Sequence, residues 1–220
     1  WDPPGRHWSG AWSQFVGGRD RTAGGTWLAV DPAGPRPAVA AVLNGRPLGP
    51  LVDGSARPTR GELALRVLAG EGLPAGDDLL PYDRFHLLLA AAGGATLWSW
   101  DGEALARRIL RGSHHIVVNA GLDAASDPLV GHFAPKLAAT ADPGPGGGWG
   151  GWPELLTGEH LPGDDPRALV VARSIDGRSY GTTSAAVVAI GLDGTVRYAF
   201  TADPADPESW GTVLGPGWAP

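Results

Sequence analysis

The chain has 220 residues, among them 35 Gly, 21 Pro and 10 Trp, with no Cys and no Met. The absence of Cys excludes disulfides, zinc–thiolate sites, iron–sulfur sites and a cysteine nucleophile within these residues. A net charge of −6 argues against nucleic-acid binding, which needs clustered positive charge, and a hydrophobic content of 43% suits one globular domain over residues 1–220.

The first residue of the chain and the length of its apolar runs give expectations about truncation, membrane spans and cellular location. A chain that lacks Met and opens at Trp1 is expected to be a fragment whose N-terminal segment is missing. The longest apolar stretch, residues 87–100, is too short and too interrupted by Gly to span a bilayer. No signal peptide is visible, so we expect a cytoplasmic protein with no membrane span.

Short apolar runs separated by Gly-rich and Pro-rich turns predict antiparallel hairpins, and two segments with helical spacing predict helices. In chain order, the expected elements are strands at 26–30 and 38–43, a helix at 59–69, strands at 85–91, 95–100 and 114–119, a helix from 127 or 128 to 139, and strands at 168–172, 182–190 and 195–201. Thr59 and Glu62 have the spacing of a capping box, and Gly93-Gly94 is expected to form a hairpin turn. Hairpins mixed with a few helices indicate an α+β sheet protein.

Two glycine motifs resemble known sites only in their letters. Gly146-x-Gly148-x-x-Gly151 matches a dinucleotide fingerprint, but no strand leads into it, so we interpret it as a flexible loop. Residues 177–181 match a serine nucleophile elbow, but the last histidine of the chain, His160, precedes the serine. A tight turn is therefore the better interpretation of residues 177–181.

Histidine and tryptophan are the remaining residue types that suggest a ligand. His114 and His115 are adjacent, and adjacent residues of a strand point to opposite faces, so they are not expected to share one metal ion. We therefore predict no metal site. Most of the tryptophans are expected in the core, although aromatic-lined clefts for planar or apolar ligands have a similar composition.

Residues 18–28, Gly-Arg-Asp-Arg-Thr-Ala-Gly-Gly-Thr-Trp-Leu, resemble a segment of the NRDE family, which is also known as the transport and Golgi organisation protein 2 family. Members of that family carry Gly-Arg-Asp-x-x-Ala-Gly-Gly-Thr-Trp-Leu-Gly. Further segments resemble family motifs in the same order, at residues 42–46, 59–63, 85–88, 117–123 and 180–184. The resemblance therefore covers nearly the whole chain.

The resemblance implies an Ntn-hydrolase-like layered sandwich of antiparallel β-sheets flanked by α-helices, here lacking its N-terminal strands. In cysteine members of that superfamily, an N-terminal cysteine attacks an amide and its own amine acts as base. That nucleophile would lie upstream of Trp1, so the 220 residues alone are expected to be inactive. The loss of strands also predicts an exposed sheet edge near residues 27–30 or 38–43.

The resemblance further suggests functional residues. Asn44 and Asn119 are the only asparagines and are candidates to stabilise an oxyanion, the alternative being that each caps a turn. Four residues are candidates to line the binding cleft, namely Arg19, Asp20, Trp27 and Arg46; the charged ones have the alternative of pairing as structural ions. Two positions, Thr183 and Val118, depart from the family pattern, which more often has Arg and Ser there.

Two functions from different classes follow from the resemblance. One is hydrolysis of a linear amide (C–N) bond in a small-molecule substrate, without a cofactor. The other is a non-catalytic carrier of haem or another hydrophobic ligand, in which tryptophans stack on a porphyrin and His114 or His115 supplies an axial nitrogen.

Overall fold

The computed structural model describes residues 1–49, 55–112, 114–143, 148–175 and 177–215. These residues are mostly antiparallel sheet with few helices, as an α+β or sheet-rich fold requires. They form two compact units. Unit 1 contains residues 1–112, 117–122 and 192–194, and unit 2 contains 113–116, 123–191 and 195–220. The single-domain expectation stays a prediction.

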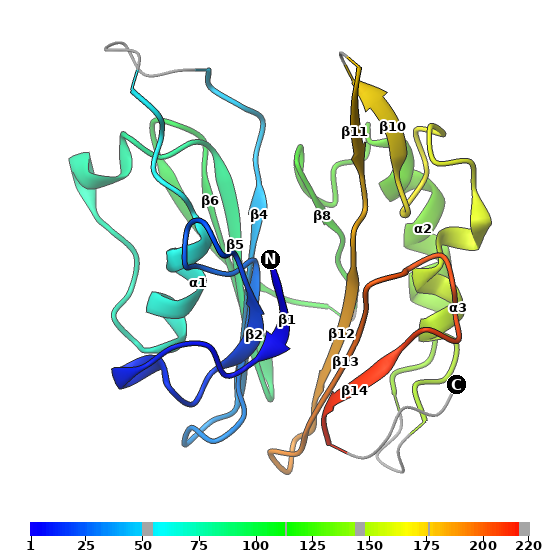
Figure 1. Ribbon diagram of the computed structural model, residues 1–220, viewed down its shortest axis with the longest axis horizontal. Coiled ribbons are helices and arrows are strands. Elements are labelled where there is room, and N and C mark those ends of the chain that lie inside the picture. The colour runs from blue at the N-terminus through cyan, green and yellow to red at the C-terminus, as the bar shows by residue number, and fades with distance from the viewer. Residues whose placement is uncertain (50–54, 113, 144–147, 176, 216–220) are drawn as a thin grey trace. The chain divides into compact units, whose positions relative to one another are not determined.

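Unit 1 is built on a seven-stranded antiparallel sheet in which each strand pairs with the next along the chain (Figure 1). Its strands are β1 (Asp2–Gly5), β2 (Val16–Arg19), β3 (Leu28–Asp31), β4 (Ala38–Asn44), β5 (Phe85–Ala91), β6 (Gly94–Trp100) and β7 (Leu105–Leu110). The hairpins predicted for β3–β4 and β5–β6 are confirmed. Two short 3-10 helices, η1 (Gly10–Trp12) and η2 (Gly76–Leu79), and a small hairpin of β8 (Val117–Val118) and β9 (Gly121–Leu122) complete the unit.

The predicted exposed edge at β3 or β4 is wrong. β3 pairs with β2 as well as with β4, and β4 pairs with β5 on its other side. The reason is that residues 2–5 and 16–19, which carry no apolar strand pattern, still form strands and extend the sheet beyond β3. Within the described residues, β1 and β7 are the outer strands of this sheet.

Helix α1 (Gly61–Leu68) lies on one face of the sheet (Figure 1) and confirms the predicted helix. Its buried side chains, Leu63, Ala64 and Val67, pack on Phe85 and Leu87 of β5. The capping box is not formed, because the helix starts from Arg60 with no side-chain cap. Instead, the hydroxyl of Thr59 accepts a hydrogen bond from the amide of Gly61 at 3.3 Å.

Unit 2 combines a three-stranded antiparallel sheet with a separate hairpin and two helices. The elements are α2 (Pro128–Ala139), α3 (Trp152–Leu156), the 3-10 helix η3 (Gly158–His160), the hairpin β10 (Ala172–Ile175) and β11 (Arg178–Gly181), and the sheet β12 (Ala185–Ile190), β13 (Val196–Thr201) and β14 (Gly211–Leu214). The hairpin predicted at residues 182–201 is confirmed as β12–β13. The tight turn predicted at 177–181 is wrong over most of its length, because residues 178–181 form strand β11, which pairs with β10, and of that range only Gly177 is a turn.

The helix predicted from residue 127 or 128 is confirmed, and its start has a clear local cause. The carboxylate of Asp127 accepts a hydrogen bond from the amide of Leu129 at 2.9 Å, and Pro128 occupies the first helical position, where no amide donor is needed. Val130 and Phe133 are its buried residues.

Two predicted strands are wrong over most of their length. At 114–119 only Val117–Val118 is a strand, because the amide of Ile116 donates to the carboxylate of Asp123 and its carbonyl accepts from the amide of Asp123. At 168–172 only Ala172 is in a strand. The amide of Val171 donates to the hydroxyl of Thr182 instead of to a neighbouring strand.

The expectation that most tryptophans lie in the core is met by three of them among the described residues. Trp100, Trp149 and Trp210 are buried, whereas Trp1 and Trp27 are 49% and 46% exposed. The glycine motif 146–151 lies partly outside the described residues. Among the described residues, no helix combines the length and apolar character needed to cross a membrane.

Candidate functional site

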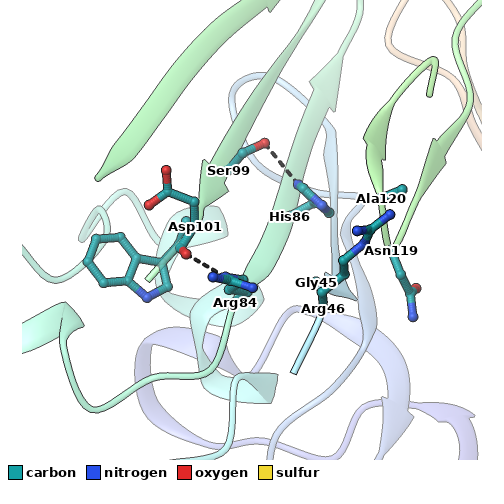
Figure 2. Close-up of a pocket in the computed structure, with 9 residues that line it drawn as sticks. Gly45, Arg46, Arg84, His86, Ser99, Asp101, Asn119 and Ala120 are labelled. Atoms are coloured by element: carbon teal, nitrogen blue, oxygen red, sulfur yellow. Dashed lines mark hydrogen bonds between the residues drawn. The ribbon is translucent and has the colours of Figure 1, made fainter. Parts of the chain in front are cut away.

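A pocket of about 150 Å³ lies in unit 1, where strands β4, β5 and β6 meet the β8–β9 turn (Figure 2). It is lined by Gly45, Arg46, Arg84, His86, Ser99, Trp100, Asp101, Asn119 and Ala120. Local hydrogen bonding brings these chain segments together. The amide of Gly45 donates to the carbonyl of Arg84 at 2.9 Å, which holds the residues after β4 beside the start of β5.

The sheet register sets two polar side chains side by side in this pocket. His86 of β5 lies directly opposite Ser99 of β6, and Nδ1 of the imidazole is 2.9 Å from Oγ of Ser99. Burial lowers the pKa of His86, and a weaker opposing effect comes from a hydrogen bond with the backbone of Asn119. The imidazole is therefore neutral at pH 7.

The charged residues of the pocket differ in how fully they are engaged. Arg84 donates from Nε to the backbone carbonyl of Asp101 (Figure 2), and its own carbonyl accepts from Arg60 at 3.1 Å. The carboxylate of Asp101 accepts from the amides of Ala104 and Glu103, which lower its pKa and keep it ionised. Among the described residues, no carboxylate pairs with Arg46.

Two of the residues suggested from sequence, Arg46 and Asn119, come together in this pocket. Asn44 does not line it. Asn44 ends β4 opposite Phe85, and the alternation of side chains along a strand places it on the face of Val42, the face covered by α1. His86 lies on the other face of the sheet. A joint oxyanion role for Asn44 and Asn119 stays a prediction.

The other suggested residues lie elsewhere in unit 1. Arg19 binds the carboxylate of Asp2 through Nε at 2.9 Å and Nη2 at 2.7 Å, which ties β2 to β1. The carboxylate of Asp20 accepts from the amides of Thr22 and Ala23, and this lowers its pKa and closes a loop. The exposed ring of Trp27 has the guanidinium of Arg60 5.8 Å from its centre. These three residues are not among those that line the pocket.

Sequence reasoning missed His86 and Ser99. His86 lies in the segment 85–88 that resembles a family motif and Ser99 lies in none, and only the exact register of the β5–β6 hairpin makes the two residues neighbours. Of the two histidines that the sequence did single out, His115 is paired with a carboxylate and not with a serine: its Nδ1 lies 2.7 Å from a carboxylate oxygen of Asp123. No group of three or more His, Asp or Glu side chains in the described part of the chain is arranged to hold a metal ion.

Searches against protein-family models, curated proteins and solved structures each give no match for this chain.

Proposed function

We propose that the chain is an NRDE-type domain of the Ntn-hydrolase-like class, and that the pocket of unit 1 binds a small anionic amide that such a domain hydrolyses. The observation that carries the proposal is the meeting of Arg46 and Asn119 in one pocket. These two residues are far apart in the chain and were suggested by separate motifs of the resemblance.

The charges of the pocket favour an anion. Its lining holds two guanidinium groups, Arg46 and Arg84, against one carboxylate, Asp101, and that carboxylate is engaged by backbone amides. His86 adds no charge at pH 7 because burial lowers its pKa. The pocket is thus positive in a chain whose net charge is −6, and the guanidinium of Arg46 can bind a carboxylate by charge-assisted hydrogen bonds.

The size of the pocket limits the ligand. A volume of about 150 Å³ is below the range of roughly 300–1,000 Å³ that holds drug-sized molecules. It suits a short acylated amino acid, in which the carboxylate meets Arg46 and the amide meets polar groups such as Asn119. The thiol that the resemblance implies as nucleophile is not supplied by these residues, which include no Cys, so binding is the property to test.

The carrier alternative receives less support. A porphyrin would need exposed tryptophan faces at its site, whereas Trp100, Trp149 and Trp210 are buried and the exposed Trp1 and Trp27 do not line the pocket. The pocket described above is also far too small for a macrocycle.

Calorimetric titration with N-acetylglycine tests the proposal. We expect saturable binding by the wild-type chain, and a loss of about tenfold or more in affinity for Arg46→Gln, because one charge-assisted interaction is worth about 1.5–3 kcal/mol. Arg36→Gln is the matched control, since Arg36 is exposed in the β3–β4 connection and does not line the pocket. Equal affinities for the two variants would contradict the role of Arg46, and equal binding of acetate and N-acetylglycine would contradict recognition of an amide.

A further inference from the structure

His86 and Ser99 form a pair that the amide-binding proposal does not use. They face each other across two hydrogen-bonded strands, so the backbone fixes both positions, and the distance of 2.9 Å is that of a hydrogen bond. Both side chains are half-buried and both line the pocket. Figure 2 shows the two side chains pointing toward one another, joined by this hydrogen bond.

The action of His86 on Ser99 depends on which ring nitrogen carries the proton. Burial lowers the pKa of His86, so the imidazole is neutral at pH 7 and one of its two nitrogens carries no proton. Nδ1 is the ring nitrogen that faces the hydroxyl of Ser99, and it is an acceptor in the tautomer that carries the proton on Nε2. Nδ1 is then unprotonated and accepts the hydroxyl proton of Ser99, which is the arrangement in which a histidine acts as a general base.

The same pocket offers a positive group for developing negative charge. When an alkoxide attacks a carbonyl, charge appears on the carbonyl oxygen, and a guanidinium stabilises it. Arg46 has no carboxylate partner among the described residues, so its donors are available to such an oxygen. Three elements of acyl transfer therefore meet at one site: a hydroxyl, a neutral base and a cation.

We propose that Ser99 is a nucleophile, activated by His86, for acyl transfer from small activated acyl esters that enter this pocket. The inference rests on the pocket alone and does not depend on the amide-hydrolase proposal.

The chemistry balances without a cofactor. Nδ1 of His86 takes the proton of Ser99 as Oγ forms a bond to the ester carbonyl carbon, and the carbonyl oxygen becomes an oxyanion beside Arg46. The intermediate collapses by breaking the bond to the alcohol oxygen, which leaves with the proton from His86. Water then attacks the acyl-serine, again losing a proton to His86, and releases the carboxylic acid and the free Ser99 hydroxyl.

The first test uses p-nitrophenyl acetate and intact-mass measurement of the whole chain. We expect p-nitrophenol release with one acetyl group on the peptide that contains Ser99, and no acetyl group there in Ser99→Ala. His86→Gln should slow acylation by about a hundredfold or more, the size of a general-base contribution. Ser9→Ala is the control, because Ser9 is exposed and makes no side-chain cap hydrogen bond. Equal rates for wild type and Ser99→Ala would overturn the proposal.

A second test uses the absence of cysteine from the chain, so that one introduced thiol is unique. The rate of alkylation of Ser99→Cys by iodoacetamide as a function of pH gives the pKa of its thiol. We expect a pKa below the ordinary value of about 8.5, returning toward it in Ser99→Cys with His86→Gln. Ser9→Cys should show the ordinary value. A Ser99→Cys thiol that titrates like the Ser9→Cys thiol would overturn the activation by His86, whatever the result for N-acetylglycine binding.

Discussion

Gly25 and Gly61 pack backbone against backbone. A methyl carbon on Gly25 would lie 2.5 Å from the carbonyl carbon of Gly61, and one on Gly61 would lie 2.9 Å from the amide nitrogen of Thr26. The amide of Thr26 also donates to the carbonyl of Gly61 at 3.0 Å. The contact joins the residues before β3 to the first turn of α1, so glycine is needed on both sides for steric reasons.

Gly61→Ala should therefore destabilise unit 1. Overpacking typically costs about 1–3 kcal/mol, and the neighbouring atoms here belong to backbone, which moves less easily than a side chain. Urea unfolding followed by circular dichroism measures the change. Gly94→Ala is the control in the same unit, because a methyl group there would have no atom within 4 Å, and we expect a change within about 0.5 kcal/mol. Equal changes in the two variants would contradict the close approach.

A buried cation in unit 2 supports a second prediction. The guanidinium of Arg197 lies 4.6 Å from the ring centre of Trp149, and the two residues are 6% and 2% exposed. A double-mutant cycle with Arg197→Met and Trp149→Leu should give a favourable coupling energy of about 1–2 kcal/mol, since cation–π contacts strengthen when they are desolvated. The cycle is needed because each single change also alters packing. A coupling energy near zero would show that the two side chains are only neighbours.

Acid stability provides a third prediction, through Asp2. Hydrogen bonds from Arg21 and Arg19 lower the pKa of Asp2 from 3.8 to about 2. A carboxylate whose pKa is lower in the folded than in the unfolded state adds stability above the unfolded value, and this stability is lost as the pH falls through the folded value. The contribution of Asp2 is therefore present at pH 5 and is lost between about pH 4 and pH 2.

Asp2→Asn should consequently lose less stability than wild type over that interval. Urea unfolding at pH 4, 3 and 2.5 gives the two slopes. The variant should still become less stable in acid, because Arg167 also lowers the pKa of Asp165 to about 2. Added salt should weaken the wild-type effect, since the arginines that hold Asp2 are partly exposed. If the free energy of unfolding fell equally with pH in the variant and in wild type, the ion pair of Asp2 with Arg19 and Arg21 would be contradicted.

The sequence predicted strands from apolar runs and helices from a helical repeat. It missed strands such as β1 and β2, which contain no apolar run and are strands only because they pair with their neighbours. Residues 38–44 and 85–91 contain apolar runs long enough to read as strands. In contrast, β1 is Asp-Pro-Pro-Gly and β2 is Val-Gly-Gly-Arg. Proline is tolerated in β1 because that strand lies at the edge of the sheet. No local sequence pattern predicts such strands, because their backbone conformation is set by hydrogen bonding to the neighbouring strands of the sheet.

The candidate site was only partly predictable for a related reason. Arg46 and Asn119 came from resemblance to motifs, whereas the His86–Ser99 pair depends on hairpin register. The sequence placed the turn at Gly93-Gly94, but Ala91 pairs with Gly94, so Ala92 and Gly93 form the turn. Moving the turn by one residue changes the pairing by two, and would have set His86 opposite Asp101 instead of Ser99.

The two glycines of this turn should therefore respond differently to the same substitution. Gly93 has φ of 86°, in the region that side chains with a branched Cβ avoid, whereas Gly94 has no such constraint and begins β6. Gly93→Val should cost about 1–3 kcal/mol, and Gly93→Asn less, because asparagine tolerates positive φ. Gly94→Val should be neutral or mildly stabilising, since valine favours strands and a Cβ there meets open space. Thermal and urea unfolding of the three variants measure these differences. A large loss of stability in Gly94→Val would favour a turn at Gly93-Gly94, and with it a register in which His86 and Ser99 do not meet.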